Sequence, residues 1–475
     1  MTALQPIVMK FGGTSVEDAG AFRRVANIVA DRLEQRPVIV VSAMSRMTDA
    51  LLAAVELAAN NQSVAAVALL QPHFERHAAV SQELLTLAEA IQFKLALQHH
   101  EAEVFQLLDS FSSDLSQRRV LQDAVLATGE QLSSALLAAA LRSLGVAAIV
   151  TDARRCIVTN DEFGTAAPLL IETTMQTRAE VLPALSASQV PVLGGFMGAT
   201  AAGVTTTLGR GGSDYTASIV GAAIKAREIQ IWTDVPGVLT ADPRVVSRAV
   251  TIPRLSYDEA AELAYFGAKV LHPKTIQPAV EGSIPVRICN SRAPDGESTL
   301  VCAEIETAAQ TVKAIAHKTG ITTVQVTSAR MLGAYGFLRA IFEVFDRHRT
   351  VVDVVTTSEV SVSLSLDDAS QLDAIVKDLE LLGTVSVETE RAMICVVGAG
   401  LRGTPGIAAR VFSTISDINV MLISQGSSSI NLTFVIEERQ LNEAVRRLHQ
   451  TFFETDNVRE PAKAERLKAA STTML

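Results

Sequence analysis

From Ile7 to about Ile288, short runs of apolar residues alternate with longer stretches in which apolar positions recur at helical spacing. A buried parallel strand reads as a continuous apolar run, whereas a covering helix repeats its apolar positions about every 3.6 residues. The pattern therefore predicts an α/β domain with an open, parallel-type sheet and helices on both faces. We expect its strands at Ile7–Met9, Val38–Val41, Ala147–Val150, Val190–Leu193 and Ile229–Trp232.

The stretch from Ala50 to about Leu144 is rich in Ala and Leu and contains almost no Gly or Pro. This composition favours helix, so we predict a long helical excursion from the sheet in which most residues serve packing. The tripeptide Thr128-Gly129-Glu130 interrupts the pattern, and we expect another helix to begin there.

After about Glu304 the chain contains two stretches of similar size, near 320–390 and 391–465, each with strand-like alternation, a helix and a returning strand. Two copies of a small β-α-β-β-α-β unit explain this better than one irregular domain. The expected elements are 324–326, 337–348, 352–355 and 360–364 in the first copy, and 394–397, 408–415, 420–423 and 432–435 in the second.

Composition narrows the classes of function. A chain of 475 residues leaves room for more than one domain. Its net charge of −10 argues against a nucleic-acid partner, because phosphate-backbone binding needs clustered Lys and Arg. No run of about 18 apolar residues suggests a membrane span. The four cysteines lie far apart, which indicates neither a disulfide framework nor a zinc site. Since no secretion signal precedes Ile7, we expect the cytoplasm.

A glycine-containing run follows the first expected strand, with the sequence Lys10-Phe11-Gly12-Gly13-Thr14-Ser15. Two glycines let the backbone approach a ligand, and the amides of the next helix point toward it with partial positive charge. Lys10 is then placed to meet a phosphoryl group. A tight strand-to-helix turn with a surface lysine explains the run equally well.

A second run, Thr205 to Thr216, also follows a strand and opens a helix. Gly209, Gly211 and Gly212 supply bare backbone, Arg210 offers a planar fork for a carboxylate, and Asp214 lies at the helix start. Packing alone explains this combination poorly. Neither run has the spacing of a P-loop, so that class of nucleotide-binding protein is excluded.

Three further polar positions suit an acidic amino-acid substrate. Ser42 and Thr48 flank the loop after the second strand, and a buried Glu130 would attract an ammonium group while Arg210 would bind an α-carboxylate. A helix-capping role for Glu130 is the alternative. The long polar loop from Trp232 to Arg244 follows a strand, where nucleotides bind in open α/β sheets.

Together these motifs, with Trp-Thr-Asp-Val-Pro-Gly from Trp232 and Phe-Gly-Ala-Lys-Val-Leu-His-Pro from Phe266, resemble the aspartate kinases over nearly the whole chain. The resemblance implies a monofunctional enzyme with an amino-acid kinase fold followed by two ferredoxin-like ACT domains. The implied ranges are 1-303 for the catalytic domain, 318-390 for the first ACT domain and 391-466 for the second, which strand 311-317 would interlace.

The resemblance also implies roles for individual residues. Lys10 would stabilise the transferring phosphoryl group, and Asp214 would orient Lys10. Aspartate would be held by Ser42, Thr48, Glu130 and Arg210. The ATP site would comprise Lys10, Phe11, Gly12, Gly13, Gly211, Gly212, Ser213, Thr233, Asp234, Arg244 and Lys269. A magnesium ion would be bound mainly through the phosphates, so no protein metal ligand is assigned.

The first ACT unit would bind an end-product amino acid, with Asp353 pairing with its ammonium group. Its residues are most similar to those of lysine-inhibited aspartate kinases, and threonine is the alternative effector. The implied effector contacts are Met331, Gly336, Phe337, Leu338, Asp353, Ser358 and Glu359. An ACT unit kept only for dimerisation is a competing interpretation.

The implied reaction converts ATP and L-aspartate into ADP and 4-phospho-L-aspartate, at the start of lysine, threonine and methionine (diaminopimelate) biosynthesis. We expect a homodimer or higher homo-oligomer formed through the ACT domains. Two alternatives are an amino-acid sensor with an inert kinase domain and a kinase for glutamate or acetylglutamate. The tandem ACT units and the Trp232 loop favour aspartate.

Overall fold

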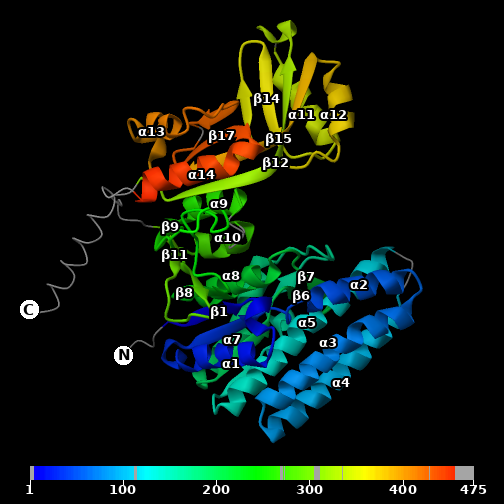
Figure 1. The fold of residues 1–475 in the computed structure, drawn as a ribbon. Helices are drawn as coiled ribbons and strands as arrows, with labels where there is room; N and C mark the ends of the chain where they lie inside the picture. The colour runs from blue at the N-terminus through cyan, green and yellow to red at the C-terminus, as the bar shows by residue number, and fades with distance from the viewer. Residues whose placement is uncertain are drawn as a thin grey trace, which may run out of the picture. The chain divides into compact units, whose positions relative to one another are not determined.

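The computed structural model describes residues 5–111, 115–267, 271, 273–303, 311–333, 335–426 and 428–454 (Figure 1). They form two compact units. The first contains the chain up to Val238 together with 253–257 and 271–303. The second contains the chain from 311 onward together with 239–252 and 258–267. Two segments that precede the regulatory region in sequence therefore pack with it.

An eight-stranded sheet organises the first unit, with the strand order β3-β5-β2-β1-β8-β10-β11-β9. The strands from β3 to β10 are parallel, and β11 pairs antiparallel with β10. In sheet order their bounds are Ala148–Val150, Val190–Gly194, Pro37–Val41, Ile7–Phe11, Glu228–Thr233, Val286–Asn290, Thr299–Cys302 and Arg254–Ser256. All five predicted strands are present. Four of them are buried along most of their length, whereas β3, at the end of the sheet, exposes Ile149 and Val150.

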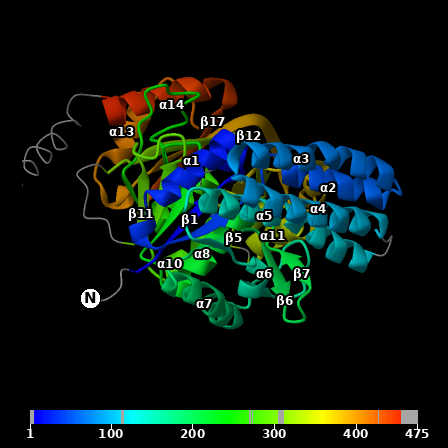
Figure 2. The ribbon, with the colours of Figure 1, turned by 90° about the horizontal axis from the view of Figure 1, so that it is seen from below.

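Helices cover both faces of this sheet, as predicted (Figure 2). On one face, Ile7, Met9 and Phe11 of β1 pack against α1 (Ala19–Ala30) and α5 (Leu115–Ser143). The opposite face carries α7 (Leu170–Ser186), α8 (Gly212–Ile224) and α10 (Pro273–Glu281). Parallel strands with buried faces need such cover, which explains their continuous apolar runs.

The predicted helical excursion comprises α2 (Met47–Ala59), α3 (Ser63–Leu84), α4 (Leu87–Asp109) and α5. The predicted helix start at Thr128-Gly129-Glu130 is wrong, because α5 passes through this tripeptide without a break. A Cβ on Gly129 would lie 2.8 Å from the Cβ of Ala43. The glycine therefore lets α5 pack closely on the loop after β2, and it does not end a helix.

Part of α5, Gln117–Ser143, is the one stretch among the described residues with the length and hydropathy of a membrane span. However, 83% of its most apolar window is buried inside the protein. Its side chains contribute Leu132, Leu136 and Leu141 to the core under β1. Its hydrophobicity is thus explained by packing.

Short elements complete the first unit. A three-stranded sheet, β4-β6-β7, is formed by Val158–Thr159, Met197–Thr200 and Thr205–Thr207. The turns and short helices are η1 (Gly13–Val16), η2 (Leu33–Gln35) and α6 (Ala153–Cys156). The helix α9 (Tyr257–Tyr265) begins in the first unit, and its residues from Asp258 onward belong to the second.

The second unit contains a six-stranded antiparallel sheet with the order β13-β14-β12-β15-β17-β16. Its central strands, β12 (Ala314–Thr327) and β15 (Thr384–Val397), are long enough to serve both regulatory halves. The ladder between them shifts register near Ile321, opposite Glu390, whose φ is +56°. The outer strands are β13 (Val355–Thr357), β14 (Ser361–Leu366), β16 (Leu422–Gln425) and β17 (Asn431–Glu437).

Each regulatory half has its own hydrophobic core. The first half packs α11 (Phe337–Arg347) and α12 (Leu372–Leu379) on β12 and β14, and the second packs α13 (Ile407–Thr414) and α14 (Leu441–His449) on β15 and β17. The remaining turns are η3 (Ala329–Met331), η4 (Leu401–Gly403), η5 (Glu438–Gln440) and η6 (Gln450–Glu454). The strand predicted at 352–355 was wrong over most of its length, since β13 begins only at Val355.

Candidate active site

The strands β1, β2, β5, β8 and β10 end at the same edge of the sheet. Their register pairs Phe11 with both Val41 and Trp232, Val41 with Gly194, and Asn290 with Thr233. Residues that follow these strands therefore lie side by side, at the edge where open parallel sheets bind ligands.

Two backbone hydrogen bonds join the first glycine run to its neighbours at this edge. The Gly12 N–H donates to the Trp232 carbonyl at 3.2 Å, and the Ser42 N–H donates to the Phe11 carbonyl at 3.0 Å. The structure thus brings the glycine run, the Ser42 loop and the start of the Thr233 loop together.

An ion pair between Lys10 and Asp214 lies at the centre of this group. The Nζ of Lys10 is 2.7 Å from Oδ1 of Asp214, and both side chains are largely buried, with exposed fractions of 12% and 18%. Asp214 belongs to the first turn of α8, which is preceded by Gly211 in a left-handed conformation with φ +74°. The amides of this turn add partial positive charge beside the lysine, so the arrangement suits a phosphoryl group.

Glu130 is buried in the middle of α5, with 3% of its surface exposed. Burial raises the pKa of its carboxyl group to about 8, although a hydrogen bond from the Ala43 amide and the charge of Lys10 act in the opposite direction. Its Oε2 atom has no hydrogen-bond partner among the described residues. A buried acceptor of this kind suits an ammonium group from a ligand.

At this edge, glycines allow neighbouring backbone segments to approach one another closely. A Cβ on Gly13 would lie 3.0 Å from the Ala43 carbonyl oxygen, and a Cβ on Gly195 would lie 2.6 Å from the Cβ of Ser213. Contacts under 3 Å would force the elements apart, so Gly195 sets how closely α8 approaches β5. Gly195 was missed by the sequence analysis.

The loop from Ser42 to Thr48 leads into α2, with Thr48 in its first turn. Arg46 has a positive φ of 68°, which is unusual for a residue with a side chain. Arg76 of α3 supports the loop, because its Nη2 donates to the Ser45 carbonyl at 2.6 Å. Arg76 was also missed, since nothing in an Ala- and Leu-rich helix links it to this loop.

Arg210 is the predicted substrate residue that the structure does not bring into contact with the others. Its side chain is exposed, and it forms no hydrogen bond or ion pair within the described part of the chain. It precedes Gly211 and Gly212 at the start of α8.

Thr233 is the last residue of β8, and Asp234 follows it. Ser291 donates to the Thr233 carbonyl through its N–H at 2.8 Å and its hydroxyl at 3.0 Å. The hydroxyl of Thr233 donates to Asp234 at 3.2 Å. Ser291 was not predicted, although it follows the strand β10 at the same edge.

Two further residues predicted for the ATP site are not part of this edge as described. Arg244 belongs to the second unit, where it pairs with Asp242 at 2.6 Å, and Lys269 lies outside the described residues.

Asp123 is a buried acid that the sequence analysis did not single out. Its carboxyl oxygens accept hydrogen bonds from the N–H and hydroxyl of Thr207, each at 2.8 Å, and from the Gly164 N–H at 2.9 Å. Burial raises the pKa of this carboxyl group despite these bonds. Asp123 therefore fixes the end of β7, from which the Arg210 loop begins.

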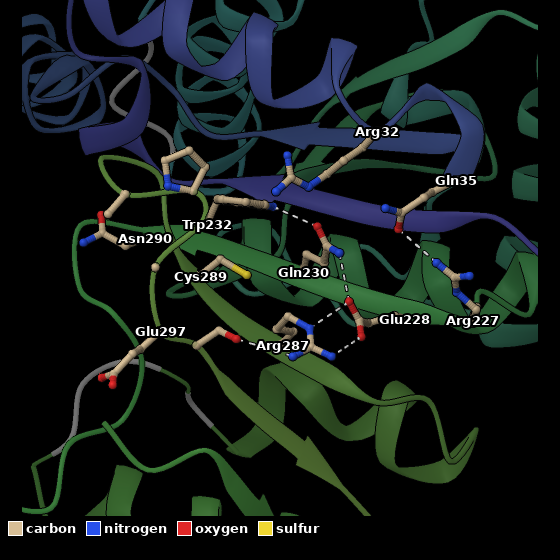
Figure 3. A pocket seen from close by; sticks show the side chains of 14 residues that line it. Arg32, Gln35, Arg227, Glu228, Gln230, Trp232, Arg287, Cys289, Asn290 and Glu297 are labelled. Atoms are coloured by element: carbon tan, nitrogen blue, oxygen red, sulfur yellow. Dashed lines mark hydrogen bonds and ion pairs between the residues drawn. The ribbon is translucent and has the colours of Figure 1, made fainter. Parts of the chain in front are cut away.

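A cavity of about 350 Å³ lies on the α1 face of the sheet, beside β8 and β10 (Figure 3). Several of its polar side chains pair with one another: Trp232 donates to Gln230, Gln230 donates to Glu228, and Glu228 accepts from Arg287. None of its lining residues is a predicted site residue. Since these groups already have partners, we assign no ligand to this cavity.

The predicted effector residues lie in the second unit. Met331 and Phe337 pack on the same core as Val355, and Gly336 precedes α11 with φ +80°. The carboxyl group of Asp353 accepts a hydrogen bond from the Tyr265 phenol. Burial and the neighbouring Asp367 raise the pKa of Asp353 to about 7.

Lys318 completes the surroundings of Asp353. It forms an ion pair with Asp367, and its Nζ lies 3.9 Å from the centre of the Tyr265 ring. Ser358, in the following turn, donates its N–H to the Ser361 carbonyl at 2.8 Å, and Leu338 and Glu359 are exposed. The group therefore combines a half-buried carboxyl group (Asp353) and an exposed one (Asp367) with an ammonium and an aromatic ring.

Comparison with known proteins identifies the family. The sequence model of the amino acid kinase family matches residues 5–290, and that of an ACT domain matches residues 394–452. The lysine-sensitive aspartokinase 3 of Escherichia coli (strain K12) is 36% identical over 463 residues, which cover 94% of this chain and 99% of the relative.

Two solved structures of E. coli aspartokinase III are also similar. The R-state complex with aspartate and ADP has a TM-score of 0.78 at 34% identity and covers 94% of this chain and 100% of its own. The T-state complex with lysine and aspartate has a TM-score of 0.79 at 35% identity, covering 94% and 99%. With its kinase-type sheet, paired regulatory halves and these matches along its length, the chain belongs to the aspartokinase family.

Proposed function

We propose that this chain transfers the γ-phosphoryl group of ATP to the side-chain carboxylate of L-aspartate, giving ADP and 4-phospho-L-aspartate. The observation that carries the proposal is the Lys10–Asp214 ion pair at the start of α8, beside the buried carboxyl group of Glu130. Acyl phosphates of this kind open the biosynthesis of lysine, threonine and methionine, which is the metabolic role we propose.

The reaction needs no covalent enzyme intermediate. A carboxylate oxygen of aspartate forms a bond to the γ-phosphorus while the bond from that phosphorus to the β–γ bridging oxygen breaks, and its electrons leave with ADP. The attacking carboxylate is ionised at neutral pH, so no general base is required. Catalysis then depends on alignment and on neutralising the charge of the phosphoryl oxygens.

Lys10 supplies that neutralisation, and Asp214 holds its ammonium group in place. Glu130 binds the ammonium of aspartate, while Ser42, Thr48 and Arg210 bind its carboxylates. Arg210 has no partner among the described residues, which leaves its guanidinium available to the α-carboxylate. These roles account for an acidic amino acid as the acceptor.

We assign ATP to the glycine runs and the loops beside them. Phe11 ends β1 and is followed by Gly12 and Gly13, and Thr233 ends β8 and is followed by Asp234. Gly211, Gly212 and Ser213 lie at the start of α8, and Arg244 and Lys269 are further proposed contacts. Magnesium would arrive with the nucleotide. We propose that the phosphate oxygens of the nucleotide hold the ion for the most part. Bound there, it would screen phosphate charge.

For regulation we propose lysine as the inhibitor, with threonine as the alternative. The E. coli relative is described as lysine-sensitive, and one of its solved structures contains lysine. Asp353 would bind an effector ammonium, supported by Met331, Gly336, Phe337, Leu338, Ser358 and Glu359. An amino acid carrying a second ammonium group would complement the two neighbouring carboxyl groups of this region, Asp353 and Asp367.

We further propose that the chain divides functionally into a catalytic domain, 1-303, and two ACT domains, 318-390 and 391-466, with strand 311-317 interlaced into the second. The continuous strands β12 and β15 support close coupling of the two ACT halves. We propose a homodimer or higher homo-oligomer formed through the ACT domains, acting in the cytoplasm.

A direct test is an ATP- and magnesium-dependent assay in which hydroxylamine traps the acyl phosphate. Aspartate, glutamate and acetylglutamate are compared side by side, each with and without lysine or threonine. We expect product from aspartate alone, reduced by lysine. Absence of acyl phosphate from all three acceptors would favour an amino-acid sensor with an inert kinase domain.

A further inference from the structure

The loop Leu239–Ile252, which carries Arg244, is built into the regulatory unit. The Ile315 N–H of β12 donates to the Thr240 carbonyl at 2.8 Å. Ala241 and Val246 are buried in the core of the second regulatory half, together with residues of β15 and α14. The loop therefore has both a backbone and an apolar attachment to regulatory residues.

A buried polar contact joins the same loop to the end of α14. Oγ1 of Thr240 lies 2.9 Å from Nε2 of His449, and the two residues are 5% and 1% exposed. The Val250 N–H donates to the same threonine oxygen at 3.1 Å. Nδ1 of His449 lies 2.9 Å from Glu454, whose carboxylate also pairs with Arg248 at 3.1 Å.

The chemistry of the groups determines which atom donates and which accepts in each of these hydrogen bonds. Glu454 is a carboxylate whose pKa is lowered chiefly by the bond to His449, so His449 Nδ1 donates to it. In the neutral tautomer, Nε2 then accepts from the Thr240 hydroxyl, whose oxygen accepts from the Val250 N–H. Every polar atom in the chain has a partner, and both ends of the chain, Val250 and Arg248, lie in the loop.

The segment that leads toward Lys269 is attached to the same strand. A Cβ on Gly267 would lie 3.0 Å from the carbonyl oxygen of His317 in β12. On its other side His317 is close enough to Asp242 and Arg244 for their charges to act on its pKa, although burial is the main cause that lowers it. The first residues of β12 therefore contact both the loop Leu239–Ile252, through Ile315, and Gly267, through His317.

We infer that Thr240 and His449 are positioning residues for nucleotide binding, because they fix the loop that presents Arg244. This inference rests on the proposed function. The Arg244 side chain is 88% exposed, and its one ion pair within the described part of the chain is to Asp242 in the same loop, so the attachment of the loop backbone decides where its guanidinium lies. A loop held before binding loses less conformational entropy when the nucleotide arrives.

The test compares Thr240→Val, Thr240→Ser and a matched control, Thr433→Val. Thr433 is a buried threonine of the same unit whose hydroxyl donates to Cys395 and does not contact the loop. Initial rates give KM for ATP and KM for aspartate separately, and the fluorescence of Trp232, the single tryptophan, reports ADP binding.

We expect Thr240→Val to raise KM for ATP and the ADP dissociation constant roughly fivefold, as for the loss of one buried hydrogen bond. KM for aspartate stays unchanged. Thr240→Ser, which keeps the hydroxyl, restores the ATP value, and Thr433→Val matches the wild type. His449→Gln, which keeps an acceptor for the Thr240 hydroxyl, should fall between Thr240→Val and the wild type.

The inference is overturned if Thr240→Val keeps the wild-type KM for ATP. It is also overturned if the variant raises KM for ATP and KM for aspartate by the same factor. An increase for ATP that Thr433→Val reproduces also overturns it, because the effect is then a general loss of stability. Failure of the wild-type protein to phosphorylate aspartate refutes the proposed function itself and is seen before any variant is measured.

Discussion

At the scale of single residues, the carboxyl group of Glu130 is buried, and we propose that it binds the substrate ammonium. Its pKa of about 8 means that the free protein holds it mostly protonated at neutral pH. The ammonium of aspartate pairs with the ionised form, so binding must displace a proton. We predict that KM for aspartate falls as the pH rises from about 6 to about 9. Initial rates over this range check it.

The control is Glu130→Gln, whose KM for aspartate should be higher, by roughly tenfold or more, and independent of pH in that range. A wild-type KM without pH dependence, or a pH dependence that persists in Glu130→Gln, would contradict the assignment of Glu130 to the substrate ammonium.

The same carboxyl group affects folding stability. Because its pKa is raised in the folded state, it favours folding fully below its ordinary value of 4.5, and this contribution is lost as the pH rises through about 8. We predict that Glu130→Gln unfolds at a higher urea concentration than the wild type at a pH of about 9. The two proteins should differ less at a pH of about 6. Equal midpoints at both pH values would argue against a buried, ionising Glu130.

Asp123 is a residue whose role is to hold backbone. Replacing it by alanine leaves the donors of Thr207 and Gly164 without their acceptor. We predict that Asp123→Ala lowers the free energy of unfolding by about 2–4 kcal/mol and also raises KM for aspartate, since the Arg210 loop begins at β7. Urea unfolding and initial rates check this. Stability close to that of the wild type would show that water replaces these bonds.

At the scale of elements, the position of α8 decides whether Asp214 reaches Lys10. A methyl group on Gly195 would lie 2.6 Å from Ser213 Cβ and 2.7 Å from its Cα, so the start of α8 has to move. We predict that Gly195→Ala lowers kcat by roughly tenfold or more, because small misalignments are costly in phosphoryl transfer. Gly403→Ala, which adds a methyl group with nothing within 4 Å, is the control and should retain activity.

The elements also show what the sequence predicts well. Apolar runs identified β1, β2, β5 and β8, because strands buried on both faces leave a local signal. The run at β3 was apolar as well, although two of its three residues are exposed. Glu130 was wrongly placed at a helix start, because a glycine inside a helix resembles a break in the sequence pattern. Gly129 instead makes room for the side chain of Ala43, which belongs to a loop far away in the sequence.

Non-local partners explain the other differences. Asp123 and Arg76 contact residues 84 and 31 positions away, and neither contact follows from local spacing. The sequence analysis predicted a long polar loop from Trp232 to Arg244 that follows a strand of the kinase domain. Thr240 in this loop nevertheless contacts His449, which lies 209 positions away in the sequence. Such packing is decided by the complete fold.

At the scale of the whole molecule, each compact unit is assembled from segments that are separated in the sequence. This arrangement suggests how an effector in the regulatory unit could act on nucleotide binding. Segments that carry proposed nucleotide contacts share a unit with the effector residues. The phenol of Tyr265, the last residue of α9, donates a hydrogen bond to the carboxyl group of Asp353. An effector ammonium that binds Asp353 has to compete with this phenol, and both segments are covalently joined to the first unit.

We predict that Asp353→Ala removes inhibition by lysine and leaves kcat and both KM values close to those of the wild type. Tyr265→Phe should lower the lysine concentration needed for half-inhibition, because the competing phenol is gone. Dose–response curves with lysine and threonine check both. Inhibition that survives unchanged in Asp353→Ala would exclude Asp353 as an effector contact.

The measurement that tests the central claim most directly is the rate of acyl-phosphate formation from aspartate and ATP by Lys10→Ala. Lys94→Ala, on the exposed surface of α4, serves as the control. The proposed mechanism predicts that Lys10→Ala loses turnover by at least about a thousandfold while Trp232 fluorescence still reports ATP binding. A Lys10→Ala variant with a rate near that of the wild type would contradict phosphoryl transfer at the Lys10–Asp214 pair.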